Sequence, residues 1–321
     1  MVFEALPRTP TAEELIDKAF SRAARTGRAQ HGTEAQLSML QTACNILSDN
    51  LQHVAATWPD FDEIHPFYRE LAGTVVDVDE LRTSLGDVSW AGRKCGEFHG
   101  EYRDRIRRAD PERARNHRKQ AFARLADVVR SVDEDLAVVA DAREKLRTFP
   151  EIHPEDPAIV VAGYPNVGKS SFVRAVTRAK APVASYPFTT TGVLVGHVEQ
   201  RHITYQIIDT PGLLDRPAAD RNEIEQQALS AITHAADCVL FLVDASEECG
   251  YPLAAQLSLR DELEKTFAPI PVLTVCNKAD RSRDVEADHY MSVAADENVE
   301  VVLTAAVDAI DYEPELPFEG E

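Results

Sequence analysis

The stretch Gly163-Tyr164-Pro165-Asn166-Val167-Gly168-Lys169-Ser170 decides the fold. Its two glycines, separated by four residues and followed by Lys and Ser, form the pattern of a phosphate-binding loop. An apolar run at 158–162 precedes it, and apolar residues at helical spacing follow at 171–178, which predicts a strand, the loop and a helix in that order. Glycines let backbone N–H groups face phosphate oxygens, and the helix N-terminus adds partial positive charge. We therefore expect a phosphate site over 163–171, with Ser171 as its last residue.

A second motif is predicted to complete the phosphate end of a nucleotide site. Within the loop, Lys169 would reach the β- and γ-phosphates, and the Ser170 hydroxyl would bind Mg²⁺. A strand expected at 203–208 ends in Asp209-Thr210-Pro211-Gly212. There the Asp can hold a Mg²⁺-bound water, and the Gly can turn its N–H toward the γ-phosphate. The polar, Pro-broken segment 181–191 is predicted to be a mobile loop whose threonines become ordered around a triphosphate.

The motif Asn277-Lys278-Ala279-Asp280 is predicted to select the base. It follows an apolar run at 271–276, and open α/β sheets bind ligands at the carboxyl ends of such strands. The Asp280 carboxylate can accept hydrogen bonds from N1–H and N2–H₂ of guanine, whereas adenine lacks those donors. Asn277 would approach the base edge, and the stem of Lys278 would cover the ring.

The C-terminal end is predicted to contain one more strand and no closing helix of normal length. The apolar run 299–303 indicates the strand, which would lead into Thr304 and Ala305 as backbone contacts to the guanine oxygen. Residues 307–321 are acidic and contain two prolines. We expect the last strand of the sheet to be left partly uncovered.

The first half of the chain, residues 1–155, is predicted to be an all-α domain, and residues 156–321 a mainly parallel α/β domain. Helices are expected at 11–27, 33–57, 64–85, 87–108 and 111–146, from apolar spacing, capping patterns and prolines. The Pro-rich stretch 150–157 is the expected linker.

The helical half contains a basic segment, Arg103–Lys119, in a chain whose formal net charge is −20. Arg side chains make paired hydrogen bonds to phosphate, so this segment is a candidate contact with an RNA backbone. A solvated helix face with local ion pairs explains the same residues, and the two interpretations stay open on sequence alone. No DNA partner is expected.

Composition excludes several other classes of protein. No apolar run approaches the length needed to cross a bilayer, and the first residues lack a signal-peptide core. The five cysteines form no CxxC pair, which argues against a disulfide or zinc framework. We expect a cytoplasmic protein without a membrane partner. The acidic surface, with only eight Lys among 34 basic residues, suggests a cytoplasm of high salt; an ordinary acidic protein is the alternative.

The motifs together resemble an Obg-superclass GTPase, and within it the Nog branch of nucleolar GTP-binding proteins. The segments 163–171 and 186–190 are similar to the Obg group as a whole. The segments that are similar to the Nog branch in particular are 64–68, 195–197, 208–217 and 246–251. The resemblance implies a protein that binds GTP or GDP with Mg²⁺ and docks its helical domain on the RNA of a large ribosomal subunit precursor. Together with the acidic, Lys-poor composition, it leads us to expect a halophilic archaeal source.

The same resemblance implies several residue roles. Thr190, the second threonine of its pair, would be a Mg²⁺ ligand beside Ser170 and Asp209. Leu213 stands where Ras-like GTPases have a water-orienting Gln, and Asn166 matches a position that holds K⁺ in related enzymes, which makes K⁺ a candidate cofactor. The predicted catalytic residues are Asn166, Lys169, Thr190 and Gly212.

The predicted function is slow, Mg²⁺-dependent GTP hydrolysis by an assembly factor of the large ribosomal subunit. A GTP-gated adaptor for a protein partner, in which hydrolysis is incidental, is the first alternative. A metabolic GTPase of tRNA modification or metal transport is the second, and the lack of a catalytic Cys motif or a His/Cys tract in the sequence argues against it.

Overall fold

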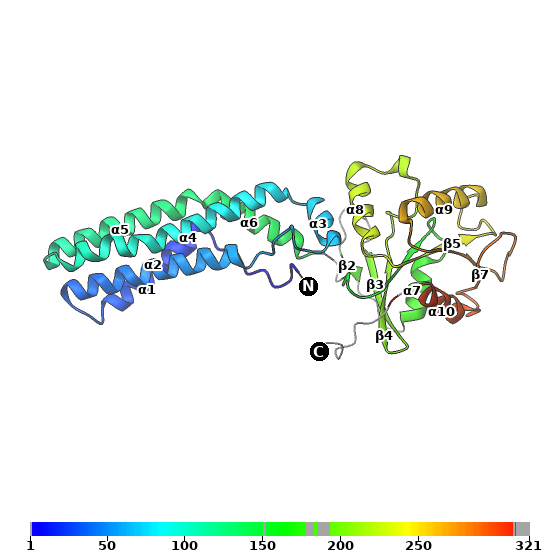
Figure 1. Ribbon diagram of the computed structural model, residues 1–321, viewed down its shortest axis with the longest axis horizontal. Helices are drawn as coiled ribbons and strands as arrows, with labels where there is room; N and C mark the ends of the chain where they lie inside the picture. The colour runs from blue at the N-terminus through cyan, green and yellow to red at the C-terminus, as the bar shows by residue number, and fades with distance from the viewer. Residues whose placement is uncertain (1, 150–151, 178–182, 185–192, 311, 313–321) are drawn as a thin grey trace, which may run out of the picture. The chain divides into compact units, whose positions relative to one another are not determined.

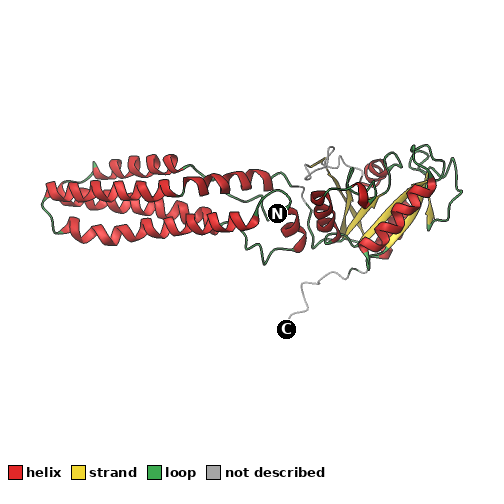
Figure 2. Ribbon diagram, turned by 90° about the horizontal axis from the view of Figure 1, so that it is seen from above, coloured by secondary structure: helices red, strands yellow, loops and turns green. Residues whose placement is uncertain are grey.

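The computed structural model describes residues 2–149, 152–177, 183–184, 193–310 and 312, and the chain divides into two compact units. One unit combines Val2–Ile64 with Val75–Arg147, and within the described residues it is entirely helical (Figure 2). The other combines His65–Thr74 with Thr148–Glu321 and contains the β-sheet. Among the described residues, no helix is long and apolar enough to cross a membrane.

The helical unit is built from helices that run back and forth along its length, with α6 continuing in the direction of α5 (Figure 1). They are α1 (Ala12–Gly27), α2 (Gly32–Ala56), α4 (Val78–Arg107), α5 (Pro111–Ser131) and α6 (Asp133–Leu146). The predicted capping box forms at the start of α1, where Thr11 and Glu14 each bond the other's backbone N–H. Gly92 brings α4 close to α2, because a Cβ there would lie 3.2 Å from the backbone N of Gln52.

Two helix boundaries predicted for this half of the chain are wrong. One helix was expected from 64 to 85 and another from 87, but α3 (Pro66–Gly73) is short and α4 continues through residue 86 from its N-cap, Asp77. The side chain of Asp77 accepts from the N–H groups of Asp79 and Glu80, so the helix begins there. The helix expected over 111–146 is interrupted at Val132, whose φ of −113° and ψ of 20° separate α5 from α6.

The second unit contains a seven-stranded sheet in the order β2-β3-β4-β1-β5-β6-β7. The pairs β4–β1, β1–β5, β5–β6 and β6–β7 are parallel, and the β2–β3 and β3–β4 pairs are antiparallel. The strands are β1 (Ala158–Ala162), β2 (Val183–Ala184), β3 (Val193–Gln200), β4 (Ile203–Asp209), β5 (Cys238–Asp244), β6 (Val272–Asn277) and β7 (His289–Tyr290). Strands β1 and β5 are buried throughout, as expected for the centre of a parallel sheet covered on both faces.

Helices cover both faces of the sheet (Figure 1). They are α7 (Lys169–Thr177), α8 (Glu223–Thr233), α9 (Leu253–Phe267) and α10 (Val299–Ala309), with a short 3₁₀ helix at Ala218–Asp220. Helices α7 and α10 contact each other on one face, and α8 and α9 lie across the sheet from them (Figure 1). Helix α3 belongs to this unit and packs against α8.

The strand predicted at 299–303 is wrong, because these residues form the first turns of α10. The buried positions of α10 are Val299, Val302, Leu303, Ala306 and Val307, which is helical spacing and not alternation. The β-branched valines of this segment have a local preference for a strand. The segment is nevertheless helical, because a helix buries one of its faces against α7 and β5. This helix also supplies the closing element that the sequence was expected to lack.

Candidate nucleotide site

The phosphate loop follows β1 with the backbone geometry that its glycines permit. Gly163 has a φ of 129°, and a Cβ there would lie 2.4 Å from the carbonyl oxygen of Leu242 on β5. Gly168 has a φ of 107°, and Asn166 has a φ of 63°. These left-handed residues reverse the chain between the buried strand and the start of α7, which begins at Lys169.

Lys169 is held inside the loop. Its side chain is almost fully buried, and its Nζ donates to the carbonyl oxygens of Gly163 at 2.7 Å and Tyr164 at 3.0 Å. Burial lowers the pKa of the Lys169 ammonium, and the negative charges of Asp209 and Asp215 act in the opposite direction. A cation that is desolvated in this way interacts strongly with a phosphate that enters the loop.

The predicted Mg²⁺ residues Ser170 and Asp209 are in contact. The Ser170 hydroxyl donates to Oδ2 of Asp209, while Oδ1 of the same fully buried carboxylate has no partner among the described residues. Burial raises the pKa of Asp209, and the Ser170 hydroxyl and Lys169 oppose that effect. A buried carboxylate oxygen without a partner beside a hydroxyl fits the oxygen ligands of Mg²⁺. Thr190, the third predicted ligand, lies outside the described residues.

The segment after Asp209 lies against the phosphate loop. The N–H of Gly163 donates to the carbonyl oxygen of Leu214 at 3.1 Å. The N–H of Gly212, predicted to face the γ-phosphate, donates to Oδ2 of Asp215 at 2.8 Å. Leu213, at the position where Ras-like GTPases have a water-orienting Gln, is apolar and buried. Sequence reasoning gave Asp215 no role, although it lies within the segment 208–217 that is similar to the Nog branch, because it falls outside the Asp209–Gly212 motif.

The base motif is joined directly to the phosphate loop. Nδ2 of Asn277 donates to the carbonyl oxygen of Val167 at 2.7 Å, and its Oδ1 accepts from the N–H of Val293 at 3.2 Å. A Cβ on Gly168 would lie 2.2 Å from the same Nδ2, so this glycine is required by close contact between the two motifs. The Asp280 side chain is exposed, with its Oδ2 4.0 Å from Nε of Arg281, so a ligand can reach the carboxylate from solvent.

Lys278 is fixed by a carboxylate that the sequence analysis did not single out. Its Nζ donates to Oδ2 of Asp244 at 2.6 Å, at the end of β5. Asp244 is fully buried and also accepts from the N–H groups of Ser246 and Cys249. Burial raises the pKa of Asp244, but its bonds to Lys278 and Ser246 outweigh burial and lower it. The ion pair therefore orients the lysine that was predicted to cover the base.

The prediction that Thr304 and Ala305 contact the guanine oxygen is wrong in its structural premise. Both residues lie inside α10, where the Thr304 hydroxyl donates to the carbonyl oxygen of Glu300. The segment that does lie beside the base motif is 292–294: the Val293 N–H bonds Asn277, and the preceding Met291 carbonyl accepts from Ala279. Its signal in the sequence is a run of small residues directly after the short strand β7.

Comparison with known proteins places the chain in a family. Residues 3–153 match the family model of the NOG1 N-terminal helical domain, and residues 158–278 match that of a 50S ribosome-binding GTPase. The chain belongs to the nucleolar GTP-binding protein 1 family. The predicted family and fold class, a helical domain followed by a P-loop GTPase domain, are thereby confirmed.

Relatives of this family differ in length. An uncharacterized protein from Methanocaldococcus jannaschii is 35% identical over 288 residues, which cover 87% of this chain and 81% of the relative. Nucleolar GTP-binding protein 1 of Drosophila melanogaster is 33% identical over 265 residues, which cover 81% of this chain and 41% of that protein. A crystal structure from Plasmodium falciparum named for the same family is 31% identical with a TM-score of 0.45, covering 50% of this chain and 89% of that one.

The basic segment lies in the family's helical domain, at the turn between α4 and α5. The side chains of Arg103, Arg105 and Arg113 form ion pairs, as the alternative interpretation expected. Four exposed side chains make no hydrogen bond or ion pair within the described part of the chain: Arg107, Arg108, Arg115 and Lys119. The segment therefore combines paired and unpaired cations.

The turn between α1 and α2 lies at the same end of the helical unit (Figure 1). Arg118 of α5 donates to Gln36 near the start of α2, which confirms that the two turns are neighbours. Arg25 and Arg28, exposed and without a side-chain partner in the described ranges, thereby join the unpaired cations of the basic segment. We call this set, Arg25, Arg28, Arg107, Arg108, Arg115 and Lys119, the basic end. The sequence analysis missed the first two because they lie about 80 residues from the rest.

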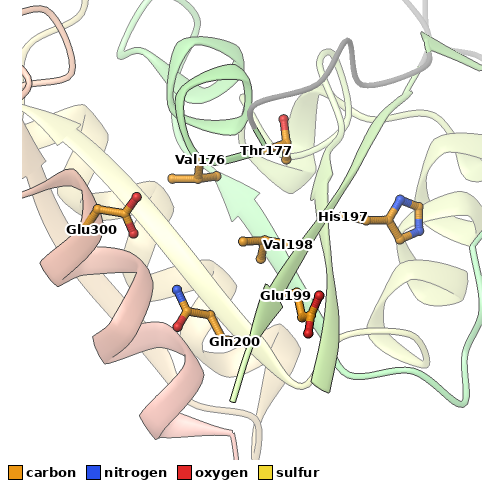
Figure 3. A pocket seen from close by; sticks show the side chains of 7 residues that line it. All are labelled: Val176, Thr177, His197, Val198, Glu199, Gln200 and Glu300. Atoms are coloured by element: carbon orange, nitrogen blue, oxygen red, sulfur yellow. The ribbon is translucent and has the colours of Figure 1, made fainter. Parts of the chain in front are cut away.

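A hollow elsewhere in the GTPase domain lies apart from the nucleotide motifs. It has a volume of about 280 Å³ and is lined by α7, β3 and α10. Figure 3 shows Val176, Val198, Gln200 and Glu300 around it, while His197 points away. The hollow opens near the last residues of α7, whereas the phosphate loop precedes the first, so it is not part of the nucleotide site.

Proposed function

We propose that the chain binds GTP together with Mg²⁺, hydrolyses it slowly, and acts on a precursor of the large ribosomal subunit. The observation that supports this most strongly is the hydrogen bond from Asn277 to the carbonyl of Val167, with Gly168 in close contact. Two motifs more than 100 residues apart are joined there into one site. Open α/β sheets bind ligands at this edge, outside the carboxyl ends of their strands.

The phosphate end of the site would act by positioning and charge. Lys169 would exchange its bonds to loop carbonyls for bonds to the β- and γ-phosphates. Ser170, Asp209 and Thr190 would hold Mg²⁺ directly or through water. When bound, the metal supplies positive charge that neutralises the developing charge on phosphate oxygens. Backbone N–H groups of 163–171 would fix the phosphates.

The base end of the site would select guanine. The exposed carboxylate of Asp280 would accept from N1–H and N2–H₂, and Lys278, fixed by Asp244, would cover the ring. Residues 292–294 replace Thr304 and Ala305 as the proposed backbone contact to the guanine oxygen, because the Val293 N–H already lies beside Asn277.

Slow hydrolysis follows from the residue after Gly212. Leu213 is apolar and buried, so it cannot orient an attacking water by a hydrogen bond. Asn166 is exposed in the phosphate loop and is the proposed ligand of a K⁺ ion. That ion would supply positive charge near the phosphates during hydrolysis. Turnover is expected to be faster in K⁺ than in Na⁺ at matched ionic strength; equal rates would contradict this role for Asn166.

The basic end supports a partner with a phosphate backbone. At one end of the helical unit lie six exposed cations that have no partner among the described residues, in a chain whose net charge is −20, so they oppose the global charge. Cations in such a patch neutralise phosphates and release counterions. The match to the family of 50S ribosome-binding GTPases, together with the nucleolar relatives, favours ribosomal RNA as this partner.

Calorimetry tests the nucleotide assignment. With Mg²⁺ present, GTP and GDP should each give a saturable heat of binding, and ATP should give none at the same concentrations. Equal heats for ATP and GTP would contradict the base selection by Asp280, and no heat for GTP would contradict the proposed site altogether.

Co-sedimentation separates the ribosomal role from a GTP-gated protein adaptor. The chain with a non-hydrolysable GTP analogue should sediment with large ribosomal subunits, and ribonuclease treatment or higher salt should release it. Binding that survives both treatments would favour a protein partner instead.

A further inference from the structure

The backbone donor assigned above to the γ-phosphate is already occupied by a carboxylate. The N–H of Gly212 donates to Oδ2 of Asp215 at 2.8 Å. Gly212 itself lies in a turn that is closed by the Leu213 N–H, which donates to the carbonyl of Thr210 at 3.1 Å. Because Leu214 also accepts from the Gly163 N–H, this turn is held against the first residue of the phosphate loop.

The charge of Asp215 reaches the groups that would receive the triphosphate. Burial lowers the pKa of Lys169, and Asp209 and Asp215 both counteract it. Burial is the main cause of the raised pKa of Asp209, and the charge of Asp215 adds to it. Asp215 therefore places negative charge near the cation and the carboxylate that serve the phosphate end of the site.

The same segment offers the Asp215 carboxylate a second set of hydrogen-bond donors. Arg216 pairs with Glu225 and Arg221 pairs with Glu262, both through terminal guanidinium nitrogens. The Nε–H groups of both arginines are buried and have no acceptor among the described residues. The charge of Asp215 also raises the pKa of Arg221, against the dominant effect of burial. Buried donors without acceptors are costly, so a carboxylate that moved to them would be stabilised.

We propose that Asp215 takes the place of the γ-phosphate on the Gly212 N–H when no triphosphate is bound, and thereby sets the preference between GDP and GTP. The inference rests on the proposed nucleotide site. GDP brings no charge to this position, so Asp215 keeps its bond. GTP brings a γ-phosphate, which repels Asp215 and competes for the same N–H. The carboxylate then moves toward Arg216 and Arg221, and only GTP binding bears that cost.

The test compares affinities in the full-length chain with Mg²⁺ present. Dissociation constants are measured for GDP and for a non-hydrolysable GTP analogue in the wild type, D215N, D215E and E223Q. Asp215→Asn keeps an oxygen acceptor for Gly212 but removes the charge, so the ratio of analogue to GDP dissociation constants should fall about tenfold. Asp215→Glu restores the charge and should restore the ratio. Glu223→Gln removes an exposed charge eight residues away and should leave both constants unchanged.

The outcomes separate this inference from the function on which it rests. A wild-type chain that binds neither guanine nucleotide would overturn the proposed site, and the inference with it. Wild-type binding together with an unchanged ratio in D215N would overturn the inference alone. An equal loss of affinity for GDP and the analogue in D215N would also overturn it, because Asp215 would then only support the local turn.

Discussion

At the scale of single residues, Asp280 is the side chain on which base selection depends. Asp280→Asn replaces one carboxylate oxygen with a donor, so GTP affinity should fall at least about a hundredfold and xanthosine triphosphate, which presents an acceptor there, should bind better than to the wild type. Competition binding with both nucleotides measures this. Asp284→Asn, an exposed change in the same loop, is the matched control. Unchanged GTP affinity in D280N would contradict the role of Asp280.

His65 links the stability of α3 to pH. Its Nδ1 accepts from the N–H of Phe67 at 3.3 Å and caps the helix. Burial is the main cause of its lowered pKa; the charge of His234 adds to the effect and Glu155 opposes it. Because the folded pKa lies below the usual 6.5, the folded state favours neutral His65, and stability is fully present above pH 6.5 and is lost as the pH falls through the folded pKa.

The variant His65→Asn isolates this effect. Asn keeps a capping oxygen and does not titrate, so the loss of thermal stability between about pH 7.5 and 5.5 should be smaller than in the wild type. His53→Asn, on the exposed surface of α2, should retain the wild-type dependence. Identical pH profiles for the wild type and H65N would show that the cap is not the titrating element.

Sequence motifs predicted residues whose spacing is set by the ligand, and missed those set by the fold. Lys169 and Asn277 belong to motifs in which each side chain has one fixed role around a nucleotide. Their position within the motif is therefore enough to predict that role. The roles of Asp215 and Asp244 are seen only in the folded chain, where Asp215 accepts from the nearby Gly212 N–H and Asp244 at the end of β5 accepts from Lys278. Residues 292–294 could be placed only once Val293 was found beside Asn277.

At the scale of elements, α4 offers a matched pair of glycines. A Cβ on Gly92 would lie within 3.2 Å of the Gln52 backbone and of Leu51. A Cβ on Gly100 would have no atom of the described residues within 4 Å. Gly92→Ala should force α2 and α4 apart and destabilise the protein by about 1–3 kcal/mol. Gly100→Ala should stabilise it by about 0.5–1 kcal/mol through helix propensity. Denaturant unfolding measures both, and equal effects would contradict the close packing.

Helices and strands could be predicted where the local conformational preference of the residues agrees with the structure that tertiary packing imposes. Strands β1 and β5 are short apolar runs that are buried on both faces, and their sequences match that environment. Helix α10 differs, because its Val-rich start favours a strand locally while packing against α7 and β5 imposes a helix. The interruption at Val132 leaves no mark in the apolar periodicity, since the residues on both sides keep helical spacing.

At the scale of the whole molecule, the basic end should control salt-sensitive binding to ribosomal RNA. Replacing Arg107, Arg108, Arg115 and Lys119 by Gln should weaken co-sedimentation with large subunits. It should also make the salt dependence shallower by about 0.7–0.9 in log–log slope for each phosphate that is no longer neutralised. Replacing Arg82 and Lys94, which are paired with acidic side chains, should change neither quantity. Equal behaviour of the two variants would contradict binding of RNA at the basic end.

Helix α3 has a consequence for any attempt to dissect the protein. Residues 65–74 interrupt the helical unit in the sequence but pack on α8, where Glu70 lies 3.0 Å from His234. Phe67, Leu71 and Ala72 of α3 are buried. A recombinant fragment that starts at residue 156 would therefore expose an apolar face of α8 and aggregate more readily than the intact chain. Supplying α3 as a separate peptide would be the rational way to restore its solubility.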